Sequence, residues 1–183
     1  KQELINEIYE FFEFKWKNDS NQSISTDEDI NMLEQLPHSV QVRIYSTFLF
    51  KDFLAKHQKF FHFEWFAKWS DTVKHAYYNW ENEQYQTFMC HLLSKLEVFY
   101  VQKGRILIGE METVNTITFM SDATIDLGYE INRTKKFVVR LSGNIMIGGY
   151  ELSFNQRAQI IYKAATKCKE SYFIRKKNWA QIS

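Results

Sequence analysis

Apolar residues in the first hundred positions recur every three or four residues, which is the spacing of amphipathic helices. Leu4, Ile8 and Phe11 form the first such face, and the polar turn-forming stretch 19–25 ends it. A second helix is expected from residue 27, because Thr26 can cap it and three acidic residues follow at the positive end of the helix dipole. A third is expected from Pro37, since the first helical turn needs no N–H there.

The segment between residues 60 and 96 is rich in aromatic residues at the same helical spacing. They stand at Phe66, Trp69, Val73, Tyr77 and Trp80, and after a polar break at Tyr85, Phe88, Leu92 and Leu96. This pattern predicts a long aromatic helix followed by another helix. Because an aromatic stripe is usually core, the expected role of the first is packing on its helical neighbours.

The pattern changes at residue 98 to short runs rich in β-branched and aromatic residues. All six glycines lie between residues 104 and 149, as is typical of turns between strands. The eight runs predicted as strands are 98–101, 105–108, 116–120, 124–127, 137–141, 145–147, 160–165 and 171–174, and a helix is expected from residue 176. The predicted fold class is α+β, with a helical part followed by an antiparallel eight-stranded β-roll and flanking helices.

Composition narrows the function classes. The 23 Lys and Arg nearly balance the 22 Asp and Glu, so no broad basic field favours nucleic acid as a partner. Cys90 and Cys168 lie far apart and the histidines follow no zinc spacing, which favours a reduced, intracellular chain without a metal site. No Ser/His/Asp order or phosphate loop is present, so we expect no catalytic residues and no enzyme.

We expect the sequence to be a segment of a longer protein. It starts at Lys1 and stops at Ser183, where a helix is only beginning. No run of eighteen apolar residues occurs, so this piece is expected to be soluble, while a membrane span upstream of Lys1 would leave no trace in it.

Four stretches, in order, carry a resemblance to a known family. Residues 8–17 (IYEFFEFKWK) and 27–44 resemble the C-linker of hyperpolarisation-activated, cyclic-nucleotide-gated and ether-à-go-go-type cation channels. Residues 92–110 resemble the start of the cyclic-nucleotide-binding roll of these channels, and 162–168 the strand pair after its phosphate cassette. The resemblance implies a C-linker over 1–82, extended by the aromatic helix, and a roll over 83–183, truncated after its C-terminal helix begins.

The same resemblance places a phosphate cassette at residues 147–159, and here the chain departs from the family. Gly148 and Gly149 stand where the family has Gly-Glu, so the ribose-binding carboxylate is missing. Ala158 stands at the phosphate arginine and Gln159 at the hydroxyl residue. Each lost charge-assisted hydrogen bond removes about 1.5–3 kcal/mol, so weak or no binding of cAMP or cGMP is expected.

One alternative alignment keeps the cassette functional. A slip of one residue brings Arg157 to the phosphate and lets Glu151 approach the ribose. The alternative function is therefore a cAMP or cGMP sensor domain of such a channel. A soluble kinase regulatory subunit or transcription factor is a third class, but no inhibitor segment or helix-turn-helix is visible in the sequence.

For partners, the resemblance implies a homotetramer at the cytoplasmic face of a membrane. Four C-linkers would form a ring beneath the membrane-embedded pore domain of the same chain and pass movements of the roll to the gate of a channel, expected to select potassium. The candidate inter-subunit residues are Ile8, Phe11, Phe12 and Trp16, whose aromatic face is wider than one short helix needs for its own core. Packing within the chain is an equally open interpretation of these four residues.

Overall fold

A computed structural model describes residues 2–24, 26–61, 63–69, 72–168 and 170–182 of the chain. The chain divides into two compact units. One combines the first 23 residues with residues 96–181, and the other spans residues 24–95 and includes residue 182. Helix α1 therefore clusters with the sheet, whereas the sequence-based division at residues 82 and 83 groups it with the other helices.

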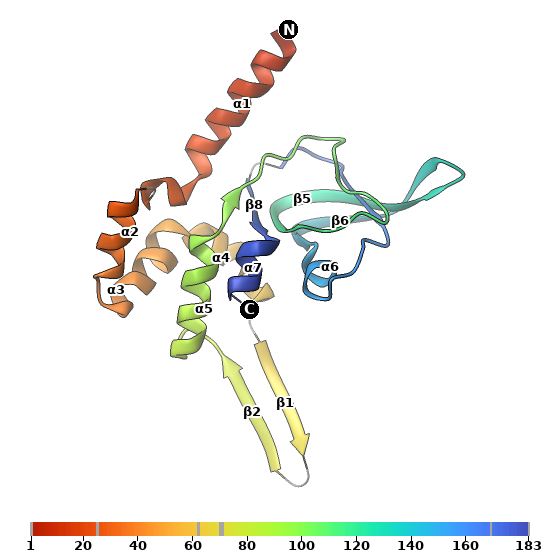
Figure 1. Ribbon diagram of the computed structural model, residues 1–183. Helices are drawn as coiled ribbons and strands as arrows, with labels where there is room; N and C mark the ends of the chain where they lie inside the picture. The colour runs from red at the N-terminus through yellow and green to blue at the C-terminus, as the bar shows by residue number, and fades with distance from the viewer. Residues whose placement is uncertain (1, 25, 62, 70–71, 169, 183) are drawn as a thin grey trace. The chain divides into compact units, whose positions relative to one another are not determined.

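The unit spanning residues 24–95 is built of short helices and one hairpin (Figure 1). Its elements are α2 (Asp27–Glu34), α3 (His38–Arg43), the π-helical turn η2 (Ile44–Leu49), α4 (Lys51–His57), the 3-10 turn η3 (Gln58–Phe60), β1 (Phe63–Trp69), β2 (Thr72–Tyr78) and α5 (Glu83–Ser94). The expected cap of α2 is confirmed, because Thr26 and Asp29 form a reciprocal capping box. Phe50, Phe53, Met89 and Leu92 lie in the core of this unit.

The predicted aromatic helix after residue 60 is wrong. Residues 63–69 and 72–78 form two antiparallel strands, in which Phe63 pairs with Tyr78 and Trp69 pairs with Thr72. Aromatic and β-branched residues have high strand propensity, and a dense apolar run satisfies the three-to-four spacing and the alternation of a strand equally well. The spacing of apolar residues therefore could not distinguish a helix from a pair of strands. The observed backbone pairing shows that the segment forms strands.

The other unit contains a curled antiparallel sheet. Its strands are β3 (Glu97–Val98), β4 (Ile106–Ile108), β5 (Thr116–Ile131), β6 (Thr134–Ile147), β7 (Ile161–Ala164) and β8 (Glu170–Arg175). Their order is β3-β8-β5-β7-β4, with β6 paired along the other edge of β5. Among its core residues, Phe119, Ile125 and Ile174 are completely buried. The helices of this unit are α1 (Gln2–Asn18), α6 (Gly149–Ser153) and α7 (Lys176–Ile182), with the 3-10 turn η1 (Ser20–Ile24) after α1.

The α+β class and the antiparallel sheet are confirmed, but the count of eight strands is not: over the described residues the sheet has six. The difference arises in β5 and β6, each of which covers two of the predicted strands. A bulge between Met120 and Ala123, with Asp122 at a φ of 49°, bends β5 without ending its pairing with β6. Through this bend, the first half of β5 pairs with β8 and the second half with β7.

No helix in the described part of the chain is both long and apolar enough to cross a membrane.

Candidate functional site

Helix α6 follows directly on β6, where the resemblance places the phosphate cassette. Gly148 caps this helix at a φ of 81°, a left-handed conformation that favours glycine. A Cβ at Gly148 would lie 2.5 Å from the carbonyl oxygen of Thr116. The backbone therefore requires glycine at this turn.

Gly149 is under no comparable constraint. A Cβ at this position would meet the terminal methyl of Met146 at 3.1 Å, and that methyl belongs to a flexible side chain. The local backbone does not explain why glycine stands where the resembled family has glutamate.

Glu151 lies in the middle of α6 and is 9% exposed. Its Oε1 accepts a hydrogen bond of 3.1 Å from the hydroxyl of Tyr162 on β7. Burial, together with the charge and the hydrogen bond of Glu151, raises the pKa of Tyr162 to about 12. The only carboxylate of α6 is thus held against the sheet by a phenol that stays protonated at neutral pH.

The segment after α6 is exposed up to Arg157 and turns inward at Ala158. Ala158 is completely buried, and Arg157 and Gln159 on either side of it are exposed. The backbone of Ala158 is fixed by two hydrogen bonds: its N–H donates to the carbonyl of Glu112 at 3.0 Å, and its carbonyl accepts from the N–H of Met111 at 2.7 Å. A one-residue slip that moved Arg157 inward would break this pair.

One side of helix α1 contacts the unit that contains the sheet, through Glu10, Phe14 and Asn18. Glu10 accepts hydrogen bonds from the hydroxyl of Tyr100 and from Nζ of Lys167, the latter at 3.2 Å. The ring of Phe14 meets that of Tyr100 edge-on at 5.2 Å. One turn further on, the backbone carbonyl of Asn18 accepts a hydrogen bond of 3.4 Å from the hydroxyl of Tyr172.

Glu10, Tyr100 and Lys167 together form a cluster that we call the clamp, and its hydrogen bonds change the pKa of Glu10. The hydrogen bond from Tyr100, followed by that from Lys167, lowers the pKa of the Glu10 carboxyl. Nζ of Lys167 lies 5.1 Å from the centroid of the Tyr100 ring, so the cation and the ring also attract each other.

The four candidate inter-subunit residues lie on the exposed part of α1. Trp16 is 68% exposed, and Ile8, Phe11 and Phe12 are each more than two fifths exposed. Phe12 touches both Phe11 and Trp16, with ring centroids 5.7 and 6.3 Å apart. Packing within the chain, the alternative interpretation of these residues, does not cover them in this structure.

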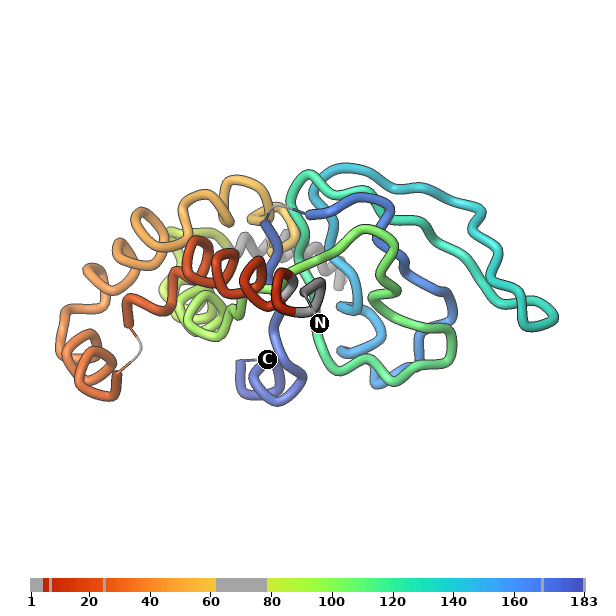
Figure 2. Tube along the Cα trace, turned by 90° about the horizontal axis from the view of Figure 1, so that it is seen from above, coloured from red at the N-terminus to blue at the C-terminus, as the bar shows by residue number. Residues whose placement is uncertain are grey.

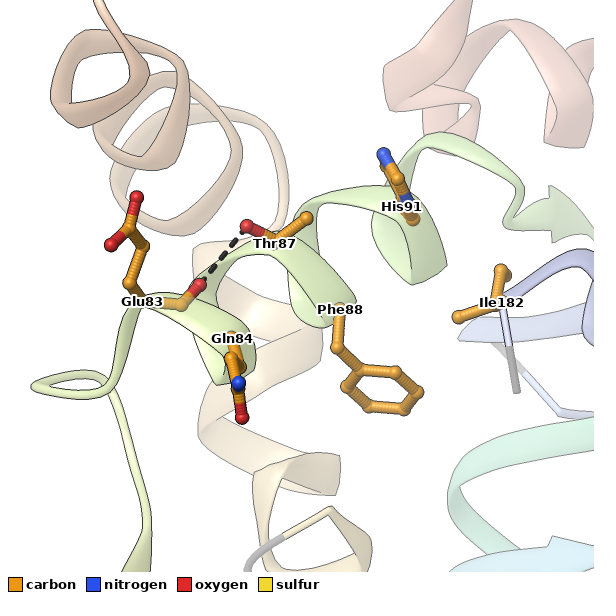
Figure 3. A pocket seen from close by; sticks show the side chains of 6 residues that line it. All are labelled: Glu83, Gln84, Thr87, Phe88, His91 and Ile182. Atoms are coloured by element: carbon orange, nitrogen blue, oxygen red, sulfur yellow. Dashed lines mark hydrogen bonds between the residues drawn. The ribbon is translucent and has the colours of Figure 1, made fainter.

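A separate hollow lies along α5, and its labelled residues are Glu83, Gln84, Thr87, Phe88, His91 and Ile182 (Figure 3). The hydroxyl of Thr87 donates to the carbonyl of Glu83 within the helix, as the dashed line shows. The lining brings together no nucleophile with a base. Over the described residues, no group of three His, Cys, Asp or Glu side chains is placed to hold a metal ion.

Sequence patterns did not predict two of these features, the hydrogen bond between Tyr162 and Glu151 and the contacts of Glu10 with Tyr100 and Lys167. Glu10 is 90 residues from Tyr100 and 157 from Lys167, and Glu151 is separated from Tyr162 by an irregular link, so only the folded chain brings these residues together. Tyr162 does fall within a stretch that carries the family resemblance, but nothing in that stretch indicates a bond to Glu151.

Comparisons with known proteins identify no matching family model and no matching curated relative. Solved structures do match. The regulatory domain of a Toxoplasma gondii protein kinase A, determined with cAMP, matches at a TM-score of 0.47 and 10% identity over 52% of this chain and 36% of that one. A cyclic nucleotide-binding-like protein from Brucella abortus matches at 0.47 and 17% identity over 53% and 83%.

The catabolite activator protein of Thermus thermophilus matches at a TM-score of 0.42 and 9% identity over 49% of this chain and 42% of that one. The matched part thus spans little more than a third of the kinase regulatory domain. At these scores the matches say what the chain is similar to, and the function is argued below from its own residues.

Proposed function

We propose that this chain is the cytoplasmic gating and assembly region of a tetrameric, voltage- or cyclic-nucleotide-regulated cation channel of the potassium type. It would couple the β-roll to the membrane-embedded pore domain of the same chain, with little or no binding of cyclic nucleotide. The observation that carries the proposal is that α1 contacts the roll unit along one side and carries an exposed aromatic cluster on another.

The docked face ties the helix to the roll. Glu10, Phe14 and Asn18 recur every four residues, so they line one side of α1, and each contacts a residue of the roll unit. A movement of the roll would therefore move α1 with it. In the resembled channels the first C-linker helix is the part that meets a neighbouring subunit and continues toward the pore.

The exposed face suits a protein partner. Phe11, Phe12 and Trp16 form a contiguous exposed aromatic cluster, and contiguous apolar patches on a surface are typical of interaction sites. The partner expected for this cluster is a second copy of the chain. In a symmetric ring every subunit carries the same exposed cluster and can pack it against its neighbour.

The cassette supports the expectation of weak nucleotide binding. Buried Ala158 fills the position of the phosphate arginine with a methyl group, and the nearby carboxylate of Glu151 is already bonded to Tyr162. A cyclic nucleotide would lack a cationic partner for its phosphate and would compete with an existing hydrogen bond for the carboxylate.

Self-association tests the assembly part. Light scattering over a range of concentrations should show oligomers for the unmodified chain, and Phe12→Asp or Trp16→Asp should shift it to monomer. Met32→Asp is the matched control, because Met32 is equally exposed but lies on α2. A chain that stays monomeric at every concentration, or that responds equally to Met32→Asp, contradicts the proposal.

The alternative function is a cAMP or cGMP sensor, favoured by one observation: Arg157 is exposed within the cassette, where it could reach a ligand by rearrangement of the segment. Calorimetry with both nucleotides separates the two functions. Gating without a ligand predicts no saturable binding. Micromolar binding that Arg157→Ala abolishes would establish the sensor instead.

A further inference from the structure

The β5–β6 hairpin projects beyond the rest of its sheet (Figures 1 and 2). The pairing of β5 with β7 stops at Gly128, while its pairing with β6 continues from Tyr129 to the end of the strand at Ile131. The tip, residues 129–136, is therefore a two-stranded ribbon. Three further residues at about 3.4 Å each give it a reach of about 10 Å.

Basic residues outnumber acidic ones in this ribbon. Residues 129–136 contain Arg133, Lys135 and Lys136 against Glu130, and Arg140 follows further along β6. One carboxylate from outside the ribbon, Glu110, accepts a hydrogen bond of 2.6 Å from the N–H of Glu130. Arg140 is paired with Asp126 at 2.6 Å, and Glu130 lies opposite Lys135 in the strand register. Arg133, Lys135 and Lys136 are all exposed.

Apolar side chains accompany these charges. Ile131 is 42% exposed and Tyr129 37%, and a little further from the turn Val138 is 61% exposed. Aliphatic groups cannot read nucleic acid by hydrogen bonds, whereas apolar side chains ringed by Lys and Arg suit the boundary between lipid headgroups and acyl chains. A reach of about 10 Å also matches the depth of about 5–10 Å to which interfacial elements enter a bilayer.

The turn at the end of the hairpin contains arginine in a backbone conformation that disfavours it. Asn132 and Arg133 connect the strands with φ values of 51° and 63°, as in a type I′ turn. Asparagine suits the first position and glycine the second, so arginine at the second is held at a cost in stability. Such a cost points to a role for the side chain outside the fold.

We propose that this hairpin tip docks on an anionic lipid surface. Arg133, Lys135 and Lys136 would contact the headgroups, and Ile131 and Tyr129 would enter the boundary region. The proposal stands on the hairpin alone and holds whether or not the chain gates a channel.

Vesicle flotation of the 183-residue chain tests it, with phosphatidylcholine vesicles with and without phosphatidylserine. Binding should require phosphatidylserine and weaken with added salt. Since each cation near such a surface contributes about 1 kcal/mol, or about fivefold, Lys135→Glu with Lys136→Glu should weaken binding by at least about 20-fold. Lys51→Glu with Lys177→Glu makes the same charge change at exposed residues elsewhere and should have little effect.

Arg133→Gly separates binding from folding. The substitution relieves the left-handed turn, so the chain should unfold at a higher denaturant concentration while vesicle binding falls about fivefold. Ile131→Ser should weaken the part of binding that persists at high salt. Equal binding to both vesicle types, equal loss in the control pair, or preference for RNA or DNA over vesicles would overturn the proposal.

Discussion

The Tyr162 hydroxyl and the Glu151 carboxylate form a hydrogen bond of 3.1 Å between β7 and α6. It joins the short cassette helix to the sheet at a point where the carboxylate is almost fully buried. A buried carboxylate needs a donor, because leaving it unsatisfied costs its full desolvation penalty. The bond therefore stabilises α6 in its position and occupies Oε1 of Glu151.

The first prediction removes that donor. Tyr162→Phe should lower the free energy of unfolding by about 1–3 kcal/mol, because it leaves a buried charged acceptor without its partner. Urea unfolding followed by circular dichroism measures the change. Tyr150→Phe is the control on the same helix, since Tyr150 is 66% exposed, and a loss as large for Tyr150→Phe would contradict the role assigned to Tyr162.

The pH dependence of the same pair gives a second readout. Burial and Glu151 raise the pKa of Tyr162 from 10.0 to about 12. A raised pKa means that the contribution is complete below the unfolded value and is lost as pH rises through the folded value. The difference in unfolding free energy between the unmodified chain and Tyr162→Phe should stay constant up to about pH 10 and shrink toward about pH 12.

The second prediction concerns the two glycines before α6. Gly148→Ala should destabilise the chain by more than about 2 kcal/mol, because it combines a left-handed φ with a contact to the Thr116 carbonyl. Gly149→Ala should cost less than about 1 kcal/mol, since the Met146 methyl can move. Thermal unfolding of the two variants measures the contrast, and equal losses would show that the turn is not the determining factor.

Sequence patterns predicted where most helices and strands lie, but they did not predict that two pairs of predicted strands join into the longer strands β5 and β6. The cap at Thr26 was predicted from local chemistry, although the reciprocal bond of Asp29 that completes a capping box was not. The merging of two predicted strands into β5 depends on a bulge at Asp122, whose left-handed backbone no strand pattern indicates. The β1–β2 hairpin was missed because its aromatic residues fit the helical spacing as well as the strand pairing.

The candidate site was located by resemblance, but its internal contacts were not predictable. The alignment with the resembled family placed Ala158 at the arginine position. The structure adds that this residue is completely buried and that two hydrogen bonds fix its backbone. The partners of Glu151 and Glu10 depend on strand order and curvature, which a one-dimensional pattern does not contain. For the aromatic residues of α1 the sequence left an inter-subunit face and packing within the chain equally open, and their exposure became known only from the structure.

The third prediction tests whether the cassette can be restored by one residue. Ala158→Arg places a guanidinium at a completely buried position, so it should destabilise the chain by about 3–5 kcal/mol and give no nucleotide binding. Gln159→Arg, at the exposed neighbouring position, should be tolerated within about 0.5 kcal/mol. Calorimetry and urea unfolding measure both effects, and a stable Ala158→Arg variant that binds cAMP would show that the pocket is open at this position.

The last prediction concerns the clamp that holds α1 on the roll. Glu10→Ala removes the acceptor shared by Tyr100 and Lys167, so α1 should detach more often and its amides should exchange hydrogen faster. Hydrogen exchange followed by mass spectrometry resolves α1 from the sheet. Glu13→Ala changes the same charge at an exposed position of the helix and should leave exchange in α1 nearly unchanged.

Acid should mimic the substitution. Because the hydrogen bond from Tyr100 and then that from Lys167 lower the pKa of Glu10 below its ordinary value of 4.5, the clamp contributes stability above that value and loses it as pH falls through the lowered pKa. Corrected for intrinsic exchange rates, protection of α1 should fall below about pH 4.5 in the unmodified chain and stay low and flat in Glu10→Ala. The same acid response in both proteins would mean that another group holds the helix, and the coupling of α1 to the roll would then lose its proposed basis.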